Sequence, residues 1–364
     1  MRIAIPTGSG AVFPAPACHS IARVTEFLVR GLKELGHEPC ILAPATSRID
    51  CEVIPICDSP VLLEEDPEFR IARDVQHAML RKLQTMLPGL DIVHAHGIEI
   101  ASKLFTTGML QEIDFPNVTT CHTCIELVDL DYFLNLRNPL VSVSDNQRRA
   151  CPTLNFVATV HNGLDPSDFP VTTAPGDYLC FLGRLVPGKQ PHVAMELAIR
   201  LGIELRIAGP PDYVFARDYF ESQCKPYFRH PLIKYLGELG FSDKVSLLAN
   251  ARCNLHPTGC REAFGLTIVE AGYCGTPTLA IRRGSLPELI EDGRTGVLVE
   301  DFAEGYHRIH ECFQLDRGHI SASTRSRFNY RRMALAYERV YHEVITGFET
   351  GCAGALQSRM RWVP

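Results

Sequence analysis

The sequence predicts an α/β protein of two domains, each built on a doubly wound parallel sheet. Short apolar stretches of strand length recur along the chain, and the segments between them are long enough for helices. This alternation is typical of parallel sheets that carry helices on both faces. The chain has 364 residues, more than a single hydrophobic core normally serves, and the alternation begins again near Tyr178.

The first half opens directly on a strand pattern. Residues 3–5 are apolar, a loop rich in glycine and proline follows, and apolar residues then fall at helical spacing between Cys18 and Leu35. Further strand-like stretches cover residues 41–42, 92–93, 118–120, 140–143 and 156–160. The order of strand, loop and helix is therefore kept through the first half.

A turn and a proline-bearing connector separate the two halves. Asn162 and Gly163 suit a turn that needs a positive φ, and three prolines stiffen the polar segment that follows. A second series of strands covers residues 178–182, 205–208, 233–236 and 251–255. We expect a first domain over residues 1–168, a second domain over 169–325, a helix over 326–346 and a mobile tail over 347–364.

Composition excludes several classes of protein. The net charge of -6 and the isoelectric point near 6.2 argue against a nucleic-acid partner, which normally requires a basic face. No apolar run approaches the roughly 20 residues that cross a bilayer, so membrane contact, if any, is peripheral. The start has no signal-peptide pattern, and the 14 scattered cysteines are expected to be reduced thiols. We therefore expect a cytoplasmic protein.

Two glutamates, Glu262 and Glu270, stand on either side of Gly265. An unbroken apolar run follows this glycine, which predicts a tight loop leading into a helix. Glu262 then lies on the loop and Glu270 in the helix, so both carboxylates can reach one ligand from different heights. The start of the helix adds N–H donors and a partial positive charge that suit a phosphate.

Charged and titratable side chains also follow two of the predicted strands. Arg184 and Lys189 flank a loop between the strand at residues 178–182 and the next helix. Arginine can contact two oxygens at once and lysine supplies a point charge, so the pair suits a diphosphate. His122 follows the strand at residues 118–120, at the sheet edge where open parallel sheets bind ligands.

These motifs resemble those of the retaining GT-B glycosyltransferases, in the large glycogen-synthase-like family four (glycosyl transferases group 1). The motifs that carry the resemblance are Glu262-Ala-Phe-Gly-Leu with Glu270 and Gly275-Thr-Pro, the Thr-x-His that ends at His122, and the Gly-Arg-Leu-x-x-x-Lys of Arg184 and Lys189. Gln190 stands where the family's last motif ends in glycine. The resemblance spans nearly the whole chain.

The resemblance implies the GT-B fold, in which two Rossmann-like domains face a central cleft and the last helix crosses back to the first domain. It also implies that Glu262 contacts the transferred sugar, that Glu270 holds the nucleotide ribose and that His122 faces the donor sugar. The residues expected to act in catalysis are Glu262, His122, Arg184 and Lys189. The residues expected to bind the donor are Arg184, Lys189, Phe264, Gly265, Leu266, Glu270, Gly209, His19 and Ser20.

One loop departs from the family's pattern. Where many relatives carry Gly-Gly-x-Glu before the first helix, this chain has His19-Ser20-Ile21-Ala22. An imidazole and a hydroxyl can both donate to a phosphate oxygen. We therefore expect His19 and Ser20 to replace the backbone donors of the paired glycines.

No metal and no cofactor are expected. No Asp-x-Asp pair stands at a strand end, and neither His94 with His96 nor Cys121 with Cys124 has the partners of a metal site. The nucleotide-diphosphate sugar is then a substrate, with a UDP-sugar favoured and GDP-mannose as the alternative. The acceptor is expected to be a hydroxyl of a saccharide, a lipid-linked sugar or a natural product.

Two other functions fit the same sequence. One is an epimerase or hydrolase of nucleotide sugars with the same fold, which needs no acceptor. The other is a catalytically silent subunit or sensor that binds nucleotide sugars. The unusual His19-Ser20 loop is the observation that suggests this alternative. The sequence leaves open the base, the sugar and the acceptor, because loop shape sets them, and it also leaves open the oligomeric state.

Overall fold

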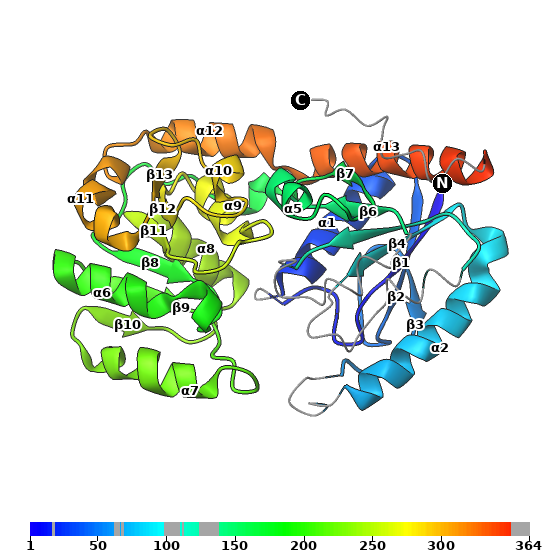
Figure 1. Ribbon diagram of the computed structural model, residues 1–364, viewed down its shortest axis with the longest axis horizontal. Helices are drawn as coiled ribbons and strands as arrows, with labels where there is room; N and C mark the ends of the chain where they lie inside the picture. Colours follow the sequence, from blue (N-terminus) through cyan, green and yellow to red (C-terminus); the bar gives the residue numbers. More distant parts are fainter. Residues whose placement is uncertain are drawn as a thin grey trace. The chain divides into compact units, whose positions relative to one another are not determined.

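The computed structural model describes residues 1–16, 19–61, 66, 69–97, 110, 113–123 and 138–350. The chain divides into two compact units (Figure 1). Unit 1 comprises Met1–Leu164 and Tyr330–Pro364, and unit 2 comprises Asp165–Asn329. Cys124 and residues 351–364 of the expected tail lie outside the described residues.

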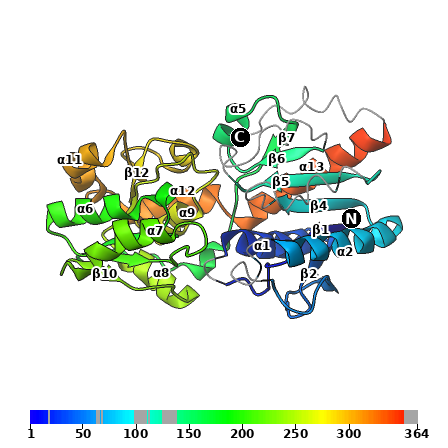
Figure 2. The same ribbon diagram turned by 60° about the horizontal axis from the view of Figure 1, so that its bottom comes forward.

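Unit 1 is built on a seven-stranded parallel sheet. Its strands are β1 (Arg2–Pro6), β2 (Glu38–Ala43), β3 (Glu52–Pro55), β4 (Ile92–Gly97), β5 (Asn117–Cys121), β6 (Leu140–Ser142) and β7 (Phe156–Thr159). Its described helices are α1 (Ser20–Glu34), α2 (Arg70–Met86), α5 (Asp145–Ala150) and α13 (Tyr330–Glu349), with a short helical turn η1 (Leu87–Gly89). The strand order is β3-β2-β1-β4-β5-β6-β7, and Figure 2 labels the strands from β2 to β7. The first six strands follow the Rossmann order.

Different helices cover the two faces of the sheet at β4. Val93 belongs to an apolar cluster with Met79 and Leu83 of α2, so α2 covers one face of the sheet. Because side chains alternate along a strand, His94 and His96 point to the opposite face. That face is covered by α13, whose tyrosines contact His94. A polar cluster therefore lies between the sheet and the last helix.

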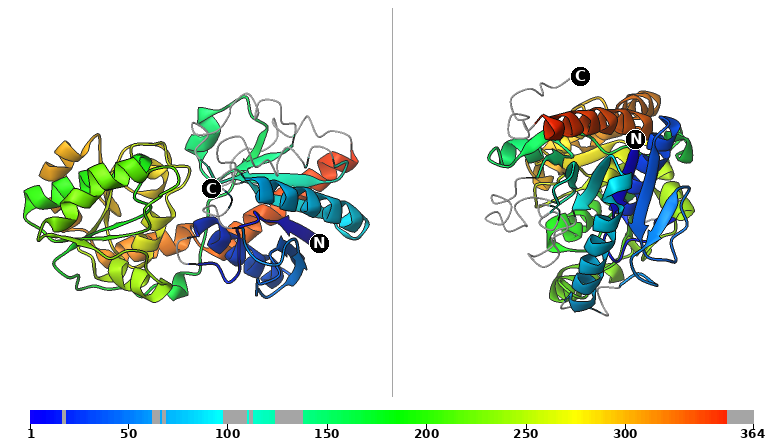
Figure 3. Two further views of the ribbon diagram at one scale, coloured as in Figure 1. Left: turned by 90° about the horizontal axis from the view of Figure 1, so that it is seen from below. Right: turned by 90° about the vertical axis from the view of Figure 1, so that its right-hand side faces the viewer.

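Helix α13 packs along α1 (Figure 3). The approach is close, because a Cβ added at Gly31 of α1 would lie 2.6 Å from the Cβ of Ala334. Polar contacts hold the same interface, since Tyr330 Oη donates to Glu34 Oε1 at 2.7 Å. The last helix is thus an integral part of unit 1, although 165 residues separate the two segments of the unit (165–329).

Unit 2 repeats the architecture with a six-stranded parallel sheet. Its strands are β8 (Leu179–Leu182), β9 (Leu205–Ala208), β10 (Ile233–Tyr235), β11 (Cys253–His256), β12 (Thr278–Ile281) and β13 (Gly296–Val299). Its helices are α6 (Pro191–Leu201), α7 (Arg217–Tyr219), α8 (Phe241–Asn250), α9 (Leu266–Tyr273), α10 (Leu286–Leu289), α11 (Phe302–Cys312) and α12 (Arg317–Arg327). Short helical turns are η3 (Pro166–Asp168), η4 (Pro187–Lys189), η5 (Phe220–Cys224) and η6 (Lys225–Arg229).

The strand order of unit 2, β10-β9-β8-β11-β12-β13, is again the Rossmann order. Helices α6 and α11 bury apolar residues against one face of the sheet, and α9 packs over β11 and β12. A close approach fixes the turn after β9. Gly209 has φ +137, and a Cβ there would overlap the carbonyl oxygen of Gly183, so only glycine fits.

The prediction of two doubly wound parallel sheets is confirmed. One element end differs slightly from the expected one, since β11 begins at Cys253 rather than at residue 251. Within the part of the chain that the structure describes, no helix is both long enough and apolar enough to span a bilayer.

Candidate functional site

The strand order of unit 2 reverses between β8 and β11. In open α/β sheets, ligands bind outside the carboxyl ends of the strands at such a switch point. The segments that leave these two strand ends are residues 183–190 and 257–265. They carry Arg184, Lys189 and Glu262, so the fold of unit 2 places the predicted charged residues at the expected edge.

Hydrogen bonds to one carbonyl join the two segments. The carbonyl of Gly188 accepts from Thr258 Oγ1 at 3.0 Å and from the backbone N–H of Gly259 at 3.0 Å. This contact brings Lys189 and Glu262 together, although 73 positions separate them in the sequence.

Glu262 is a buried carboxylate with a cationic partner. Its exposed fraction is 8%, and Lys189 Nζ donates to its Oε1. Burial by itself raises the pKa of Glu262, but the positive charge of Lys189 and the nearby His256 imidazole outweigh it and hold the pKa well below its usual range. Glu262 is therefore ionised at neutral pH.

His256 is a site residue to which the sequence assigned no role. It ends β11 and is buried, and its Nε2 lies 3.5 Å from Oε1 of Glu262. That nitrogen has no hydrogen-bond partner among the residues that the structure describes. Its place at a strand end beside the switch point is the one signal that could have identified it.

A glycine turn holds the backbone of Glu262 in place. Gly284 has φ +61, and a Cβ there would lie 2.6 Å from the backbone nitrogen of Glu262. Ser285 then donates its N–H to the carbonyl of Glu262 at 3.1 Å and its Oγ to the carbonyl of Phe264 at 2.7 Å. The Glu262 loop is therefore fixed by backbone contacts on both sides.

The start of α9, four residues after Glu262 in the sequence, offers unpaired N–H groups. Gly265 precedes the helix with φ +92, and no side chain caps it. The N–H groups of Leu266 and Thr267 meet no acceptor in the described part of the chain, as expected for a first helical turn. Such donors, together with the helix dipole, favour an anion.

Phe264, which lies between Glu262 and Gly265, has an apolar side chain that packs inside unit 2. Its side chain is buried and meets the ring of Phe328 edge to face, with the ring centroids 5.9 Å apart. It packs in the interior of unit 2, so its backbone is the part that lies next to the α9 start.

Glu270 has a separate partner. Its Oε1 accepts a hydrogen bond of 2.6 Å from Lys244 Nζ on α8, and each side chain is only 4% exposed. Sequence reasoning missed Lys244, because a lysine in a helix normally lies at the surface. Glu262 and Glu270 thus occupy two different ion pairs.

Arg184 lies on the outer side of the loop. Its side chain is 57% exposed, and its Nη1 is 3.4 Å from Oδ2 of Asp212. Gln190 adopts the left-handed conformation with φ +49, which explains why glycine suits the corresponding position of the family motif. Gly209 supports the neighbouring turn by its close approach to Gly183, as described above.

The remaining predicted residues belong to unit 1. His19 and Ser20 are exposed at the start of α1, and the His19 side chain makes no capping hydrogen bond. His122 follows β5 and is partly buried, with its Nε2 2.8 Å from Nδ1 of His96. Burial lowers the pKa of His122 to about 4, so its imidazole is neutral at physiological pH.

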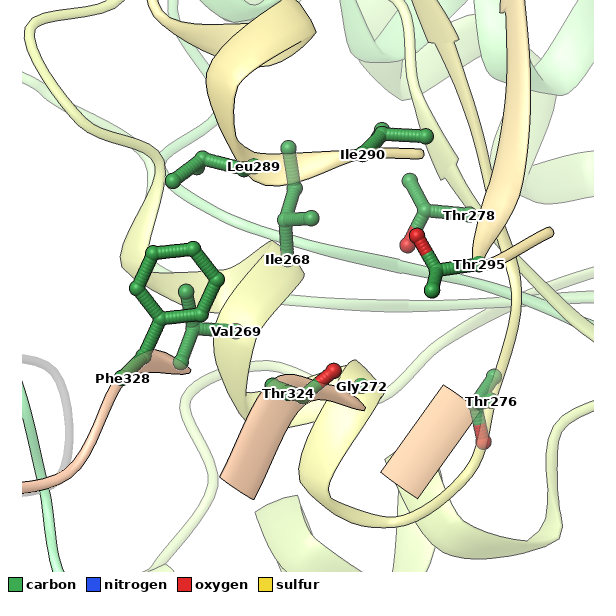
Figure 4. Close-up of a pocket in the computed structure, with 10 residues that line it drawn as sticks. All are labelled: Ile268, Val269, Gly272, Thr276, Thr278, Leu289, Ile290, Thr295, Thr324 and Phe328. Carbon is green, nitrogen blue, oxygen red and sulfur yellow. The ribbon is translucent and has the colours of Figure 1, made fainter. Parts of the chain in front are cut away.

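A small pocket lies beside α9 (Figure 4). The residues that line it are Ile268, Val269, Gly272, Thr276, Thr278, Leu289, Ile290, Thr295, Thr324 and Phe328. Its free space corresponds to about one water molecule, which excludes a sugar nucleotide. Within the described residues, no three His, Cys, Asp or Glu side chains are grouped to hold a metal ion.

Comparisons with known proteins agree with this arrangement. The family model described as "Glycosyl transferases group 1" matches residues 170–310, and the one described as "Glycosyltransferase Family 4" matches residues 21–168. The chain is 25% identical over 337 residues to glycogen synthase from Mycobacterium tuberculosis, an alignment that covers 78% of this chain and 80% of that protein.

Two solved structures are similar over almost their whole length. One is AviGT4, a glycosyltransferase involved in Avilamycin A biosynthesis, with a TM-score of 0.70, 22% identity, and coverage of 95% of this chain and 98% of that chain. The other is Anabaena Alr3699/HepE in complex with UDP and glucose, with a TM-score of 0.72, 17% identity, and coverage of 94% and 100%. The two family models match one unit each, and the paired Rossmann-like sheets agree with these structures. The chain therefore belongs to the group 1 (family four) glycosyltransferases and has the GT-B fold.

Proposed function

We propose that this protein is a retaining, metal-independent glycosyltransferase that moves a sugar from a nucleotide-diphosphate sugar to a hydroxyl acceptor. The observation that carries the proposal is the buried Glu262 carboxylate, which is paired with Lys189 and stands on the loop that leads into α9 with its unpaired first N–H groups. One short segment therefore carries both a fixed negative charge and anion donors. A sugar with a developing positive charge and a departing diphosphate need these two kinds of group.

The leaving diphosphate gathers negative charge as the glycosidic bond breaks. Arg184, Lys189 and the N–H groups that follow Gly265, beginning with that of Leu266, are the donors assigned to it, with Gly209 shaping the adjacent turn. Lys189 is shared between Glu262 and the phosphate. Donors already fixed in place cost little reorganisation during the reaction, so these groups make a metal ion unnecessary.

The other residues receive roles from the family resemblance. Glu262 contacts the transferred sugar, Glu270 holds the ribose and His122 faces the donor sugar, while His19 and Ser20 contact the phosphates. Phe264 contributes its backbone. Retention of the anomeric configuration, which we assign to front-face attack, rests on the same resemblance.

A UDP-sugar is the favoured donor, and GDP-mannose is the alternative. The complex of Alr3699/HepE with UDP and glucose supports the first choice. The acceptor is a hydroxyl of a saccharide, a lipid-linked sugar or a natural product, and no cofactor is needed. The cysteines of the described residues are all free thiols, which supports a cytoplasmic location.

Donor turnover with and without acceptors tests the proposal. Purified protein is incubated with UDP-glucose or GDP-mannose and an acceptor panel in excess chelator, and released nucleotide is measured. We expect release that depends on the acceptor, with a product of unchanged anomeric configuration by NMR. Sugar conversion without an acceptor would instead identify an epimerase or hydrolase, and saturable binding without turnover would identify a binding subunit. Activity that chelation abolishes and magnesium restores would overturn the metal-independent reaction.

A further inference from the structure

His96 and His122 form an end-to-end pair on one face of the unit 1 sheet. His96 Nδ1 lies 2.8 Å from His122 Nε2. The two rings are nearly coplanar, with an interplanar angle of 11° and centroids 5.1 Å apart. The centroid separation exceeds the nitrogen-to-nitrogen distance by about two ring radii, so the bond runs along the line of the ring centres. This is the linear geometry of a good N–H···N hydrogen bond.

A buried network keeps the His96 ring from turning. His94 packs against it with ring centroids 4.4 Å apart. His94 itself is fixed on both sides, because its Nδ1 lies 2.7 Å from Tyr341 Oη and its Nε2 lies 2.8 Å from Thr120 Oγ1. Thr120 Oγ1 is also 2.9 Å from Tyr337 Oη. The pair is therefore anchored to α13.

We infer that His96 is a positioning residue that holds Nε2 of His122, so that Nδ1 of His122 is the nitrogen presented to the substrate, as a hydrogen-bond donor. The inference rests on the proposed function in one respect, namely the contact between His122 and the donor sugar. The inference assigns two further features, namely the residue that orients His122 and the ring nitrogen on which His122 carries its proton.

The proton assignment follows from the far nitrogen of His96. The His96 side chain is 96% buried (4% exposed), and its Nε2 has no hydrogen-bond partner among the described residues. A neutral imidazole carries one N–H and one lone pair. Buried N–H groups without an acceptor are rarer than acceptors left unsatisfied. His96 therefore keeps its proton on Nδ1 and donates it to His122 Nε2.

The tautomer of His96 determines the tautomer of His122. Its Nε2 accepts from His96, so a neutral His122 carries its proton on Nδ1. Burial lowers the pKa of both imidazoles, which keeps the pair neutral at physiological pH. Within the described residues, the hydrogen bond of the His122 ring is the one at Nε2. The proton on Nδ1 is the one that we assign to a sugar oxygen.

NMR of the parent protein tests the tautomer without any substitution. In protein labelled with ¹⁵N at histidine, long-range proton–nitrogen spectra distinguish the two neutral forms, and His122→Gln assigns the signals. We expect His122 to carry its proton on Nδ1 and His96 to carry its own on Nδ1. A proton on Nε2 of His122 would overturn the inference. This measurement does not depend on turnover, so it is separate from the proposed function.

Variants test the positioning role. His96→Asn keeps an amide donor where Nδ1 stands, and His96→Leu removes it. Loss of one neutral hydrogen bond is worth about two- to tenfold, so His96→Leu should lower kcat/KM for the donor by about that factor, and His96→Asn should restore most of it. Calorimetry with the free nucleoside diphosphate, which lacks the sugar, should give the same affinity for the parent and both variants. A loss of nucleotide affinity equal to the loss of kcat/KM would mean general disruption and would overturn the inference.

A double-mutant cycle links the two histidines. In a His122→Ala background, His96→Leu should have no further effect on kcat/KM. Additive effects would show that His96 acts independently of His122 and would reject the positioning role. Tyr330→Phe serves as the control, because it removes a hydrogen bond of α13, that to Glu34, outside the network that holds the His96–His122 pair. It should leave kcat/KM for the donor almost unchanged.

Discussion

Lys244 Nζ lies 2.6 Å from Oε1 of Glu270 and joins α8 to α9 through a pair of charges that are almost completely buried. Removal of one member leaves the other charged, desolvated and without its counter-ion. Lys244→Met, which keeps most of the side-chain volume, should therefore lower the free energy of unfolding by about 3 to 5 kcal/mol. Chemical denaturation followed by circular dichroism gives this value.

A surface pair of the same length is the control for Lys244. Lys225 Nζ also lies 2.6 Å from a carboxylate, that of Glu221, but both side chains are about half exposed. Lys225→Met should change the free energy of unfolding by less than about 1 kcal/mol. The double variant Lys244→Met with Glu270→Gln should recover a large part of the lost stability, because no unpaired charge is then buried. Equal changes in the free energy of unfolding for Lys244→Met and Lys225→Met would show that burial of the ion pair does not determine its contribution to stability.

The two glutamates should differ in what they bind. Glu270→Gln is expected to weaken binding of the free nucleoside diphosphate, because a ribose acceptor is weakened. Glu262→Gln should leave that affinity nearly unchanged and lower kcat, because Glu262 is assigned to the sugar that the nucleotide alone lacks. Calorimetry and steady-state kinetics on both variants make the comparison. Equal losses of nucleotide affinity would reject the separate assignments.

Much of the fold could be predicted from the sequence because strands buried on both faces appear as short apolar runs. Residues 3–5, 92–93 and 205–208 lie in β1, β4 and β9. Helix α12 gave no such signal. It is polar, and its buried Arg317 contacts the carbonyls of Ala249 and Ala251 at 2.7 and 3.0 Å, contacts that depend on chain segments more than 60 positions away. Periodicity cannot reveal them.

The sequence also predicts part of the candidate site, because strand patterns show which loops follow strands. It does not predict contacts between residues that are far apart in the sequence. Loop residues after strands, such as Lys189 and Glu262, could be expected at one sheet edge, because parallel strands end there together. Their direct ion pair could not be expected, since it depends on hydrogen bonds to Gly188. Lys244 and His256 were missed because helical spacing and strand alternation report burial but do not identify a charged partner far along the chain.

Arg184 should act mainly in the transition state. Negative charge on the diphosphate increases as the bond breaks, so Arg184→Ala is expected to lower kcat by about 10² to 10³ with a smaller rise in KM. Steady-state kinetics with varied donor measures both constants. Arg294→Ala is the matched control, because Arg294 is similarly exposed at 65% and lies 3.6 Å from Glu291. A change confined to KM in Arg184→Ala would contradict the assignment.

Gln190 offers a test of backbone strain. Its φ of +49 is unfavourable for a residue with a Cβ by about 1 to 2 kcal/mol, and the greater freedom of glycine in the unfolded chain offsets about 0.5 to 1 kcal/mol of this. Gln190→Gly should therefore stabilise unit 2 by up to about 1 kcal/mol. Both variants lose the contact of the glutamine side chain with Gly259. Gln190→Ala should destabilise unit 2, because it loses this contact and keeps the strain, whereas Gln190→Gly relieves the strain. The melting temperature should be highest for Gln190→Gly, intermediate for the parent and lowest for Gln190→Ala. A higher melting temperature for the alanine variant than for the glycine variant would show that the backbone at residue 190 is not strained.

Unit 1 should lose stability in mild acid because of its buried histidines. Burial lowers the pKa of His94 to about 3, whereas an unfolded histidine titrates near 6.5. The unfolded chain therefore binds more protons than the folded one once the pH falls below about 6.5, so stability is complete above that pH and is lost as the pH falls towards 3. At pH 5 the cost is about 2 kcal/mol for His94 alone. The melting temperature should therefore fall between pH 7.5 and pH 5, and it should fall less in His94→Gln, which cannot take up the proton. Glutamine can still form hydrogen bonds in this network, so the variant isolates the titration. Identical pH dependence in parent and variant would mean that His94 titrates normally in the folded protein.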